Sequence, residues 1–362
     1  MESRDVYTQR ELDEVLSEPD LIPICAGEGE FEVSADRFVR AADAARVRIG
    51  GAASIEAGGS ATVVASERAH VTARNTVTVE AADSAVVIAG NHVFVRARGR
   101  ARVTAGAYSI VEAADDTFVV AQARAAVRAA DRCHVRALLS ARVQMSDEAR
   151  AWIWGLSSAH ATGHSTVTAW GSAKVSALDS ASVEALETAI VVAGGAATVR
   201  AFGSVMVRAR GRAKVQATDG VAVMRHGPNV TVSGGTAREA VRPGTAEEWC
   251  RYYGVPLENG VATLYKAVND DFDSYHGLTY RPGNEPRAPD WDGGERECGG
   301  GLHFSPRPTF ALPVPGDELR FVACPVRLED IVFHPDGDYP DKVKAAAVCA
   351  PVYEVLEDGT PV

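Results

Sequence analysis

Hydrophobic and polar residues alternate along most of the chain in a pattern that repeats every eight residues. From residue 45 to residue 236 the sequence divides into 24 blocks of eight, which begin ARVRIGGA, ASIEAGGS and ATVVASER. Position 3 of the block is Val or Ile in 21 of the 24 blocks, and position 5 is Ala in 19. The exceptions at position 3 are Ala151, Ala159 and Thr231. Because positions 2 and 4 are mostly polar, each block predicts a short strand that turns positions 1, 3 and 5 inward.

The end of each block predicts a corner. Position 7 is Gly, Asp or Asn in 19 of the 24 blocks, and these residues adopt turn conformations most readily. One block cannot bury its apolar face alone, so neighbouring blocks must stack on one another. The pattern therefore predicts a parallel β-solenoid over residues 29–236, in which residues 29–44 form two looser blocks. A long helix is excluded, because corner glycines and a period of eight do not suit a helical turn.

The number of blocks in one coil follows from side-chain size. Small residues at positions 1 and 5 allow two sheets to lie close together, so we expect two blocks, or 16 residues, in each coil. Three blocks per coil, which would form a triangular prism, is the alternative.

The segments outside the repeat predict three further parts. Residues 1–28 are expected to cap the first coil, because Thr8 and Glu11 match a helix-capping box and a short helix should end near Ser17. Residues 21–33 are expected to form a strand that enters the first coil. Residues 237–259 are expected to hold a linker, at 236–245, and a helix at 246–253. Residues 260–362 predict a small α+β domain, with strands at 261–268, 301–305, 320–326 and 344–355 and a long loop at 281–300.

Composition narrows the function classes. The chain has 362 residues, with 37 Lys and Arg against 48 Asp and Glu and a formal charge of −11, which argues against nucleic-acid binding by the protein as a whole. No apolar run is long enough for a membrane span, and the first residues do not resemble a signal peptide. We therefore expect a cytoplasmic protein with no membrane partner. Six cysteines in this length are too few for a disulfide scaffold.

The charge is unevenly distributed along the chain. Residues 45–236 hold 21 basic and 14 acidic residues, whereas both flanking segments are acidic. The runs RARGRAR at 96–102 and RARGRAK at 208–214 should point Arg98, Arg100, Arg208 and Arg210 outward. We expect this patch to serve solubility or contact with the acidic ends. Binding of an anion or a nucleic acid is the alternative.

One irregular block predicts a contact surface. In ARAWIWGL (149–156), Trp152 and Trp154 should lie outward or at a corner. An exposed tryptophan of this kind indicates docking of the C-terminal domain, a protein partner or self-association.

The repeat resembles the paired octapeptides of bacterial ice-nucleation proteins, most closely in ATGHSTVTAWGSAKVSALDSASVEA at 161–185. The resemblance implies a similar coil. Ice templating in that family is attributed to an outward Thr-x-Thr ladder, and here only Thr166 and Thr168 flank an inward Val in that way. The corresponding positions elsewhere hold charged residues such as Arg96 and Arg128, so ice nucleation is not expected.

The C-terminal part, with LYKAV at 264–268 and CGGGLHFSP at 298–306, resembles a domain of actinobacterial and phage proteins of unknown function. Similar proteins pair such a domain with an Ala/Ser/Val solenoid. The resemblance implies no activity. The expected function is that of a structural or binding protein in which the solenoid displays the C-terminal domain.

A Gly-rich run carries the alternative, an enzyme. Gly299, Gly300 and Gly301 lead into a strand, and glycines let a ligand approach backbone amides. The run faintly resembles the ADP-ribosyltransferase pattern, which implies NAD as the cofactor and a nicotinamide pocket. The residues that would line this pocket are Tyr265, Tyr280, His303 and Ser305, with Glu354 as the polarising acid. Lys266 and the lack of a clear Glu motif depart from that family, and a tight turn with His303 in a polar core is the other interpretation. No cofactor is expected outside this alternative.

A metal site is the weakest interpretation. Cys298, His303, Cys324 and Cys349 fall on neighbouring predicted strands, and Cys250 and His334 are further candidates. Structural zinc takes four ligands, usually with closely spaced cysteine pairs. No such pair occurs here, so buried free thiols are expected and no metal is predicted.

Overall fold

The computed structural model describes residues 2–34, 36–311, 320–335, 337 and 339–362. These residues divide into two compact units by their internal contacts. The first, here called the solenoid unit, comprises Met1–Arg208, Ala213–Val223 and Thr231–Ala237. The second, the C-terminal unit, comprises Ala209–Arg212, Met224–Val230 and Arg238–Val362. Each unit is described by itself.

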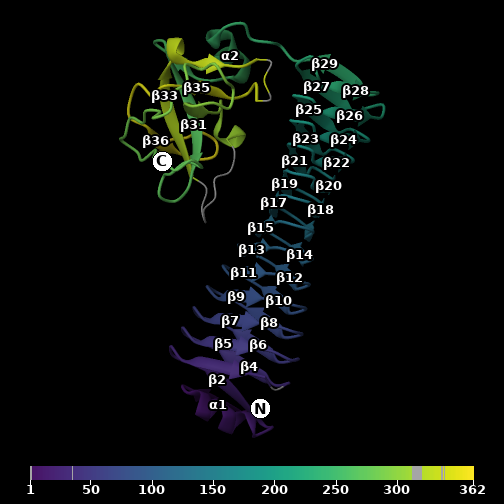
Figure 1. Ribbon diagram of the computed structural model, residues 1–362, viewed down its shortest axis with the longest axis vertical. Coiled ribbons are helices and arrows are strands. Elements are labelled where there is room, and N and C mark those ends of the chain that lie inside the picture. Colours follow the sequence, from purple (N-terminus) through teal and green to yellow (C-terminus); the bar gives the residue numbers. More distant parts are fainter. Residues whose placement is uncertain (1, 35, 312–319, 336, 338) are drawn as a thin grey trace. The chain divides into compact units, whose positions relative to one another are not determined.

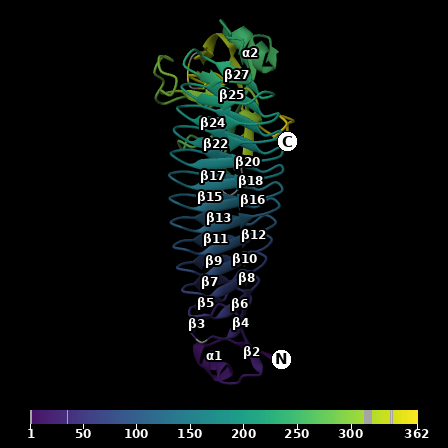
Figure 2. The same ribbon diagram turned by 90° about the vertical axis from the view of Figure 1, so that its right-hand side faces the viewer.

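Two parallel sheets form the coils, and successive strands alternate between them (Figures 1 and 2). Among the described residues, one sheet has 15 strands and the other 14. From β2 (Leu21–Cys25) to β26 (Lys214–Ala217), each strand of the first sheet pairs with the strand 16 residues further on, so that Val87 lies between Val71 and Val103. The predicted β-solenoid with two blocks in each coil is thus confirmed.

The first sheet contains β1 (Glu2–Val6), β2 (Leu21–Cys25), β4 (Phe38–Ala41), β6 (Ser54–Ala57), β8 (His70–Ala73), β10 (Val86–Ala89), β12 (Arg102–Ala105), β14 (Phe118–Ala121), β16 (His134–Ala137), β18 (Arg150–Ile153), β20 (Thr166–Ala169), β22 (Ser182–Ala185), β24 (Thr198–Ala201), β26 (Lys214–Ala217) and β28 (Thr231–Ser233). The second contains β3 (Glu30–Val33), β5 (Arg46–Ile49), β7 (Thr62–Ala65), β9 (Thr78–Ala81), β11 (Phe94–Ala97), β13 (Ile110–Ala113), β15 (Ala126–Ala129), β17 (Arg142–Met145), β19 (Ser158–Ala161), β21 (Lys174–Ala177), β23 (Ile190–Ala193), β25 (Met206–Arg210), β27 (Ala222–His226) and β29 (Thr236–Glu239).

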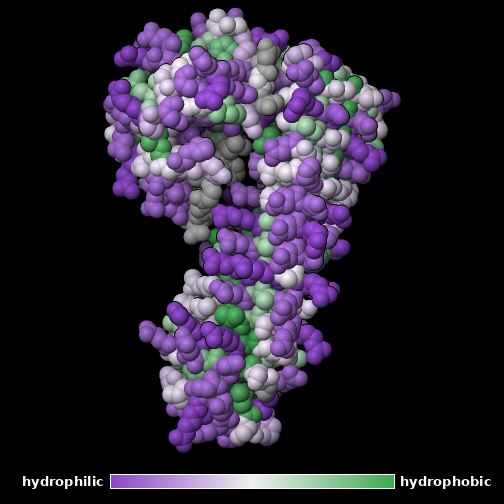
Figure 3. All heavy atoms as spheres, in the orientation of Figure 1, coloured by the Kyte–Doolittle hydropathy of each residue, from purple (hydrophilic) through white to green (hydrophobic). Residues whose placement is uncertain are grey.

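The core between the sheets consists of small and β-branched side chains. In the block that contains β15, Ala125, Val127 and Ala129 are buried, and the intervening side chains are less so. Ala151 and Ala159, which lack the usual Val, are buried as well. Polar side chains dominate the face of the molecule drawn in Figure 3, and over the N-terminal coils its hydrophobic residues gather in a narrow strip.

The corners depend on a left-handed backbone at position 7 of the block. Gly163 has a φ of 64°, and a Cβ there would lie 2.9 Å from the Asp147 backbone nitrogen. Asp115, Asp131 and Asp147 also have positive φ, which Asp tolerates better than most residues. The Asp115 amide donates to Oδ2 of Asp131 at 3.1 Å, and the Asp131 amide to Oδ2 of Asp147 at 3.4 Å. The acidic corner residues thereby tie consecutive coils together.

The repeat contains one insertion that the block pattern misses. Lys214 pairs with Thr231, and Val215 with Val232, both 17 residues further on. The prediction of uninterrupted blocks to residue 236 is therefore wrong, and Val230 instead of Thr231 is buried. The extra residue lies between β27 and β28, where Gly227 has a φ of 97° and Pro228 follows. The expected linker at 236–245 is also partly wrong, because β29 continues the second sheet.

The N-terminal segment folds against the first coils. Helix α1 (Gln9–Leu16) buries Leu12 and Val15 and contacts β1, β2 and β3. Thr8 Oγ1 accepts from the Glu11 amide at 3.3 Å, and Glu11 Oε2 accepts from the Tyr7 amide at 2.7 Å, which confirms the predicted capping residues. The single strand expected at 21–33 is wrong, because Gly27, with a φ of 73°, lies in the turn that separates β2 from β3.

The C-terminal unit contains two antiparallel sheets and a short helix. Its elements are α2 (Ala246–Tyr253), β30 (Leu257–Glu258), β31 (Val261–Val268), β32 (Leu302–Phe304), the 3₁₀ turns η1 (Pro308–Phe310) and η2 (Leu328–Asp330), β33 (Arg320–Arg327), β34 (Val332–Phe333), β35 (Val343–Ala345) and β36 (Tyr353–Val355). The sheets have the strand orders β30-β31-β33-β36 and β32-β35-β34. The predicted helix at 246–253 is confirmed, whereas the single strand expected at 344–355 is two short strands in different sheets. No described helix is long and apolar enough to cross a membrane.

Candidate functional site in the C-terminal unit

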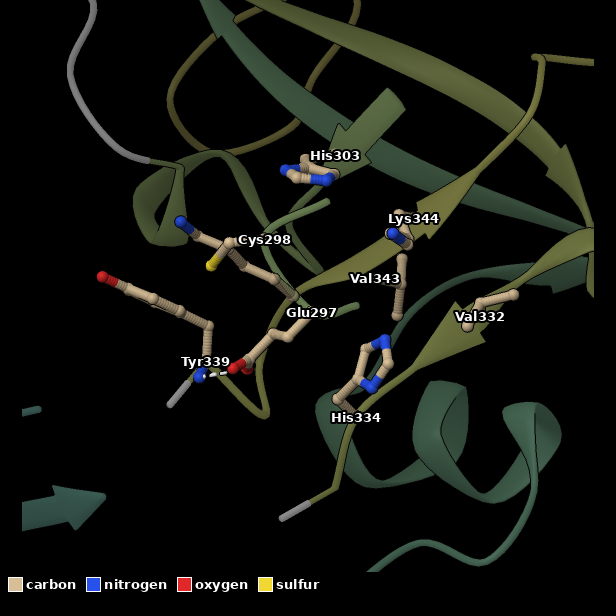
Figure 4. A pocket seen from close by; sticks show the side chains of 9 residues that line it. Glu297, Cys298, His303, Val332, His334, Tyr339, Val343 and Lys344 are labelled. Carbon is tan, nitrogen blue, oxygen red and sulfur yellow. Dashed lines mark hydrogen bonds between the residues drawn. The ribbon is translucent and has the colours of Figure 1, made fainter. Parts of the chain in front are cut away.

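A small polar pocket lies beside the three-stranded sheet. It encloses about 30 Å³. Its lining is Glu297, Cys298, His303, Val332, His334, Tyr339, Lys342, Val343 and Lys344. Figure 4 shows Glu297, Cys298 and Tyr339 on one side and Val332, Val343 and Lys344 on the other. A volume of this size admits about two water molecules or one small ion.

Lys344 organises one wall of this pocket. It stands on β35, its side chain is buried, and its ammonium donates to Asp292 Oδ1 at 2.7 Å. The same nitrogen donates to the carbonyl oxygens of Arg296 and Gly300, at 2.6 and 3.0 Å. Three acceptors match the three protons of an ammonium group, and the Lys344 bond holds the pKa of Asp292 below its ordinary value. Lys344 therefore fixes the loop that carries the Gly-rich run.

The charges of three lysines act on His303 in this pocket. Burial and, to a lesser extent, the ammonium groups of Lys266, Lys344 and Lys342 together lower the pKa of His303 to about 4. Lys266 donates to the His303 carbonyl oxygen at 2.9 Å, and burial lowers its own pKa to about 8. Burial also lowers the pKa of Lys342. His303 is consequently a neutral imidazole at pH 7, surrounded by three amino groups.

Two imidazole nitrogens of the pocket are buried without a partner. Nε2 of His303 and Nε2 of His334 have no hydrogen-bond partner among the described residues. A buried polar atom without a partner is uncommon and calls for a water molecule or a ligand. His303 is the middle residue of β32 and His334 directly follows β34, so only the folded sheet brings the two imidazoles to one pocket.

The Gly-rich turn itself is filled by the chain. A Cβ on Gly299 or Gly300 would overlap Asp292 or Asp290, and one on Gly301 would lie 2.9 Å from the Trp291 ring. The Gly301 amide already donates to Asp290 Oδ1 at 3.1 Å. The glycines thus admit the chain's own loop at the place where sequence reasoning expected a ligand.

The residues of the ADP-ribosyltransferase pattern do not share this pocket. Tyr280 belongs to the main core of the unit, and Tyr265 to a smaller cluster with Ala323 and Val355. Ser305 is buried, and its backbone pairs with that of Tyr265. Glu354 forms an ion pair with Arg320 at 3.2 Å. Of the five proposed catalytic residues, His303 alone lines the described pocket.

The cysteines are likewise dispersed. Cys324 is in the core, where burial raises its pKa, whereas Cys298 is exposed and Cys349 half-buried. Cys298 and His303 both line the pocket. Within the described part of the chain, no group of three or more His, Cys, Asp or Glu side chains is arranged to hold a metal ion.

The four arginines expected to form a basic patch on the repeat differ in their exposure to solvent. Arg98, Arg100 and Arg208 are exposed. The prediction that Arg210 faces outward is wrong: it is buried, because its guanidinium forms an ion pair with Asp341 within the C-terminal unit. One coil after Arg100, at the same position of the block, Asp116 accepts two hydrogen bonds from Arg132, at 2.8 and 3.1 Å. Basic and acidic side chains are therefore interleaved along this edge.

Comparison of the chain with protein-family models, curated proteins and solved structures finds no match. The function of the site is consequently inferred from its geometry alone. Sequence reasoning did not select Lys342, Lys344 or Asp292, because lysine is common on surfaces and Asp292 stands in an acidic loop. The signal available was a pair of lysines at the start of an otherwise apolar run, KVKAAAVCAP at 342–351.

Proposed function

We propose that the protein is a binding protein, in which the β-solenoid is a rigid scaffold that carries the C-terminal unit as its ligand-binding part. The proposed ligand is a small oxyanion, or the oxyanion end of a larger molecule. The observation that carries this proposal is the convergence of three lysine ammonium groups on His303, beside a pocket with two unpartnered imidazole nitrogens.

The chemistry of the pocket favours an oxyanion over a metal ion. The ammonium groups of Lys342 and Lys344 repel a cation and attract an anion. Asp292 offsets the charge of Lys344, and the Glu297 carboxylate in the same lining acts against the attraction of Lys342. A neutral imidazole offers either a proton or a lone pair at Nε2. Hydrogen phosphate has both acceptor oxygens and a donor hydroxyl, so it suits Lys342 and both imidazoles. Binding of an anion should also raise the pKa of His303, because it offsets the lysine charges.

The size of the pocket favours a small group over a dinucleotide. A cavity of about 30 Å³ is far below the size of common cofactor sites. The ADP-ribosyltransferase interpretation requires NAD to contact Tyr265, Tyr280 and His303, and these residues lie in separate clusters. Nucleic-acid binding by the basic solenoid surface has less support, because ion pairs such as Arg96–Glu112 and Arg132–Asp116 neutralise part of its basic charge.

The experiment is a thermal-unfolding titration of the full chain with inorganic phosphate and, separately, with NAD. Phosphate should raise the melting temperature by mass action, and Lys342→Met or His303→Gln should remove this effect. His276→Gln changes an exposed histidine of the same unit and should leave it intact. Stabilisation by NAD and not by phosphate would overturn the proposal in favour of the enzyme, and indifference to both would overturn the proposed ligand class.

A further inference from the structure

One corner row of the solenoid unit carries an apolar ridge. The row is position 6 of the blocks whose strands belong to the first sheet. In five consecutive coils it holds Leu138, Trp154, Trp170, Leu186 and Phe202, here called the apolar ridge. Before the ridge the same row holds Ala, Gly, Arg and Gln, ending at Gln122, and after it Thr218. The apolar side chains are therefore confined to one stretch of coils.

The register places these side chains directly above one another. The strands next to them pair at intervals of 16 residues, so neighbours in the row are about 4.8 Å apart and the ridge is about 19 Å long. The rings of Trp154 and Trp170 stack at 4.8 Å between centroids and 4° between planes. All five side chains are partly exposed, and the neighbouring Leu139 and Leu156 are 64% and 70% exposed.

The fold itself does not need this ridge. Coils nearer the N-terminus form the same corner with Gly58, Gly90 or Gly106 in the row. Contiguous exposed apolar side chains on a soluble protein mark an interaction surface. The opposite corner row, with Asp115, Asp131 and Asp147, is charged over part of the same stretch. The two edges of one coil thus have different chemistry.

The stacking of the rings limits the kind of partner. Sugars and nucleobases bind to the faces of aromatic rings, and Trp154 and Trp170 present their faces to each other. The ridge offers ring edges and aliphatic side chains instead, which suit another apolar edge of similar shape. A second copy of this chain has such an edge.

Charge complementarity selects an antiparallel second copy. A two-fold axis across the ridge at Trp170 sets Trp154 opposite Leu186 and Leu138 opposite Phe202. The next coil outward contains Arg124 at one end of the ridge and Asp219 at the other, and both are exposed. In the antiparallel arrangement each Arg124 meets an Asp219 of the other copy, whereas the parallel arrangement sets like charges against each other. We propose that the apolar ridge joins two copies of the chain edge to edge in antiparallel orientation.

The interface is small. A ridge about 19 Å long lies at the low end of specific interfaces, so the dimer should be reversible and dependent on concentration. Analytical ultracentrifugation of the full chain over a concentration series measures its dissociation constant. The double variant Trp154→Gln, Trp170→Gln, which uses a residue already present in the row, should raise that constant at least about tenfold. Trp152→Gln is the matched control, because Trp152 lies on the sheet surface and stacks on His134.

A charge reversal tests the orientation and does not depend on the tryptophans. Arg124→Glu should weaken the dimer. The double variant Arg124→Glu, Asp219→Arg should restore it at both low and high salt, because the two opposite charges have only exchanged places. A chain that stays monomeric at all concentrations would overturn the proposal. So would a dimer that the double tryptophan variant leaves intact, or a charge exchange that fails to restore association.

Discussion

The cores of the two units differ in the kind of side chain that fills them. The solenoid unit repeats Ala and Val between its sheets, and its buried polar side chains among the described residues are Ser109, Thr117, Ser157 and Ser165. The C-terminal unit buries Trp249, Tyr280, Phe304 and the ammonium-bearing Lys344. In the first unit each inward residue has an equivalent one coil away. In the second each buried side chain has neighbours of its own.

This difference determines where chemistry is possible. In the solenoid unit the inward positions hold small side chains, and the polar ones among them, such as Ser109 and Thr117, donate to backbone carbonyl oxygens. Larger polar side chains are confined to the outward rows and the corners. In the C-terminal unit a buried lysine holds a loop, and the loop shapes a pocket. The repeat therefore forms a rigid scaffold, and the irregular C-terminal unit provides the unique contacts that a binding site requires.

The largest expected loss of stability follows from replacing the buried Lys344. Lys344→Met removes three hydrogen bonds and takes the buried ammonium donor from Asp292 and from the carbonyl oxygens of Arg296 and Gly300. Breaking a buried ion pair from one side typically costs about 3–5 kcal/mol. We expect the C-terminal unit to unfold in an earlier, separate transition while the coils persist, which amide hydrogen exchange of the full chain resolves.

Lys174→Met provides the contrast, because Lys174 is an exposed outward residue of β21 and its loss should change little. Equal destabilisation of both units by Lys344→Met would contradict the division described above.

A smaller effect is a pH dependence that belongs to the C-terminal unit. The pKa of His303 is about 4 in the folded chain and 6.5 when unfolded. Between pH 6.5 and pH 4 the unfolded state therefore binds a proton that the folded state excludes, so stability falls as the pH is lowered through this range. The loss is about 1–3 kcal/mol. Denaturant unfolding at several pH values measures it.

His303→Gln should remove this part of the pH dependence, and His276→Gln should retain it. A pH dependence that survives His303→Gln unchanged would assign the acid sensitivity to another group.

The smallest expected change in stability comes from substitutions at the corners of the solenoid unit. Ala123 stands at position 7 with a φ of 54°, a conformation that suits glycine better than alanine. Ala123→Gly should stabilise the coils by about 0.5–1 kcal/mol. The same substitution at Ala126, in strand β15, should destabilise them by about 0.5–1 kcal/mol.

Thermal unfolding of the two single variants compares the signs directly. Two shifts of the same sign would contradict the assignment of position 7 as a left-handed corner.

Much of the solenoid could be predicted from the sequence, because a regular solenoid requires the same side-chain types at the same interval. Val87 and its equivalents at position 3 identify the inward face, and the turn residues at position 7 identify the corners. The pattern failed at Thr231, because one extra residue shifts the register and only the pairing of Val215 with Val232 reveals it. Strand β1 was not predicted, since it lies outside the repeat and has no periodic pattern of its own.

The candidate site was predictable only in part. His303 was selected from its Gly-rich run, and His334 was noted among the metal candidates, but nothing local joins either residue to Lys342 or Lys344. The glycines at 299–301 looked like a ligand cradle, because a close approach of the chain's own loop has the same signature in sequence.

The sequence by itself therefore determined the coil and its inward and outward faces, since these follow from periodicity, and it favoured two sheets over three through side-chain size. Only the tertiary structure decided which side chains meet at the pocket and which stack into the apolar ridge. The physical reason is that strand pairing and loop closure bring together residues far apart in the chain, and their proximity leaves no periodic trace in the sequence.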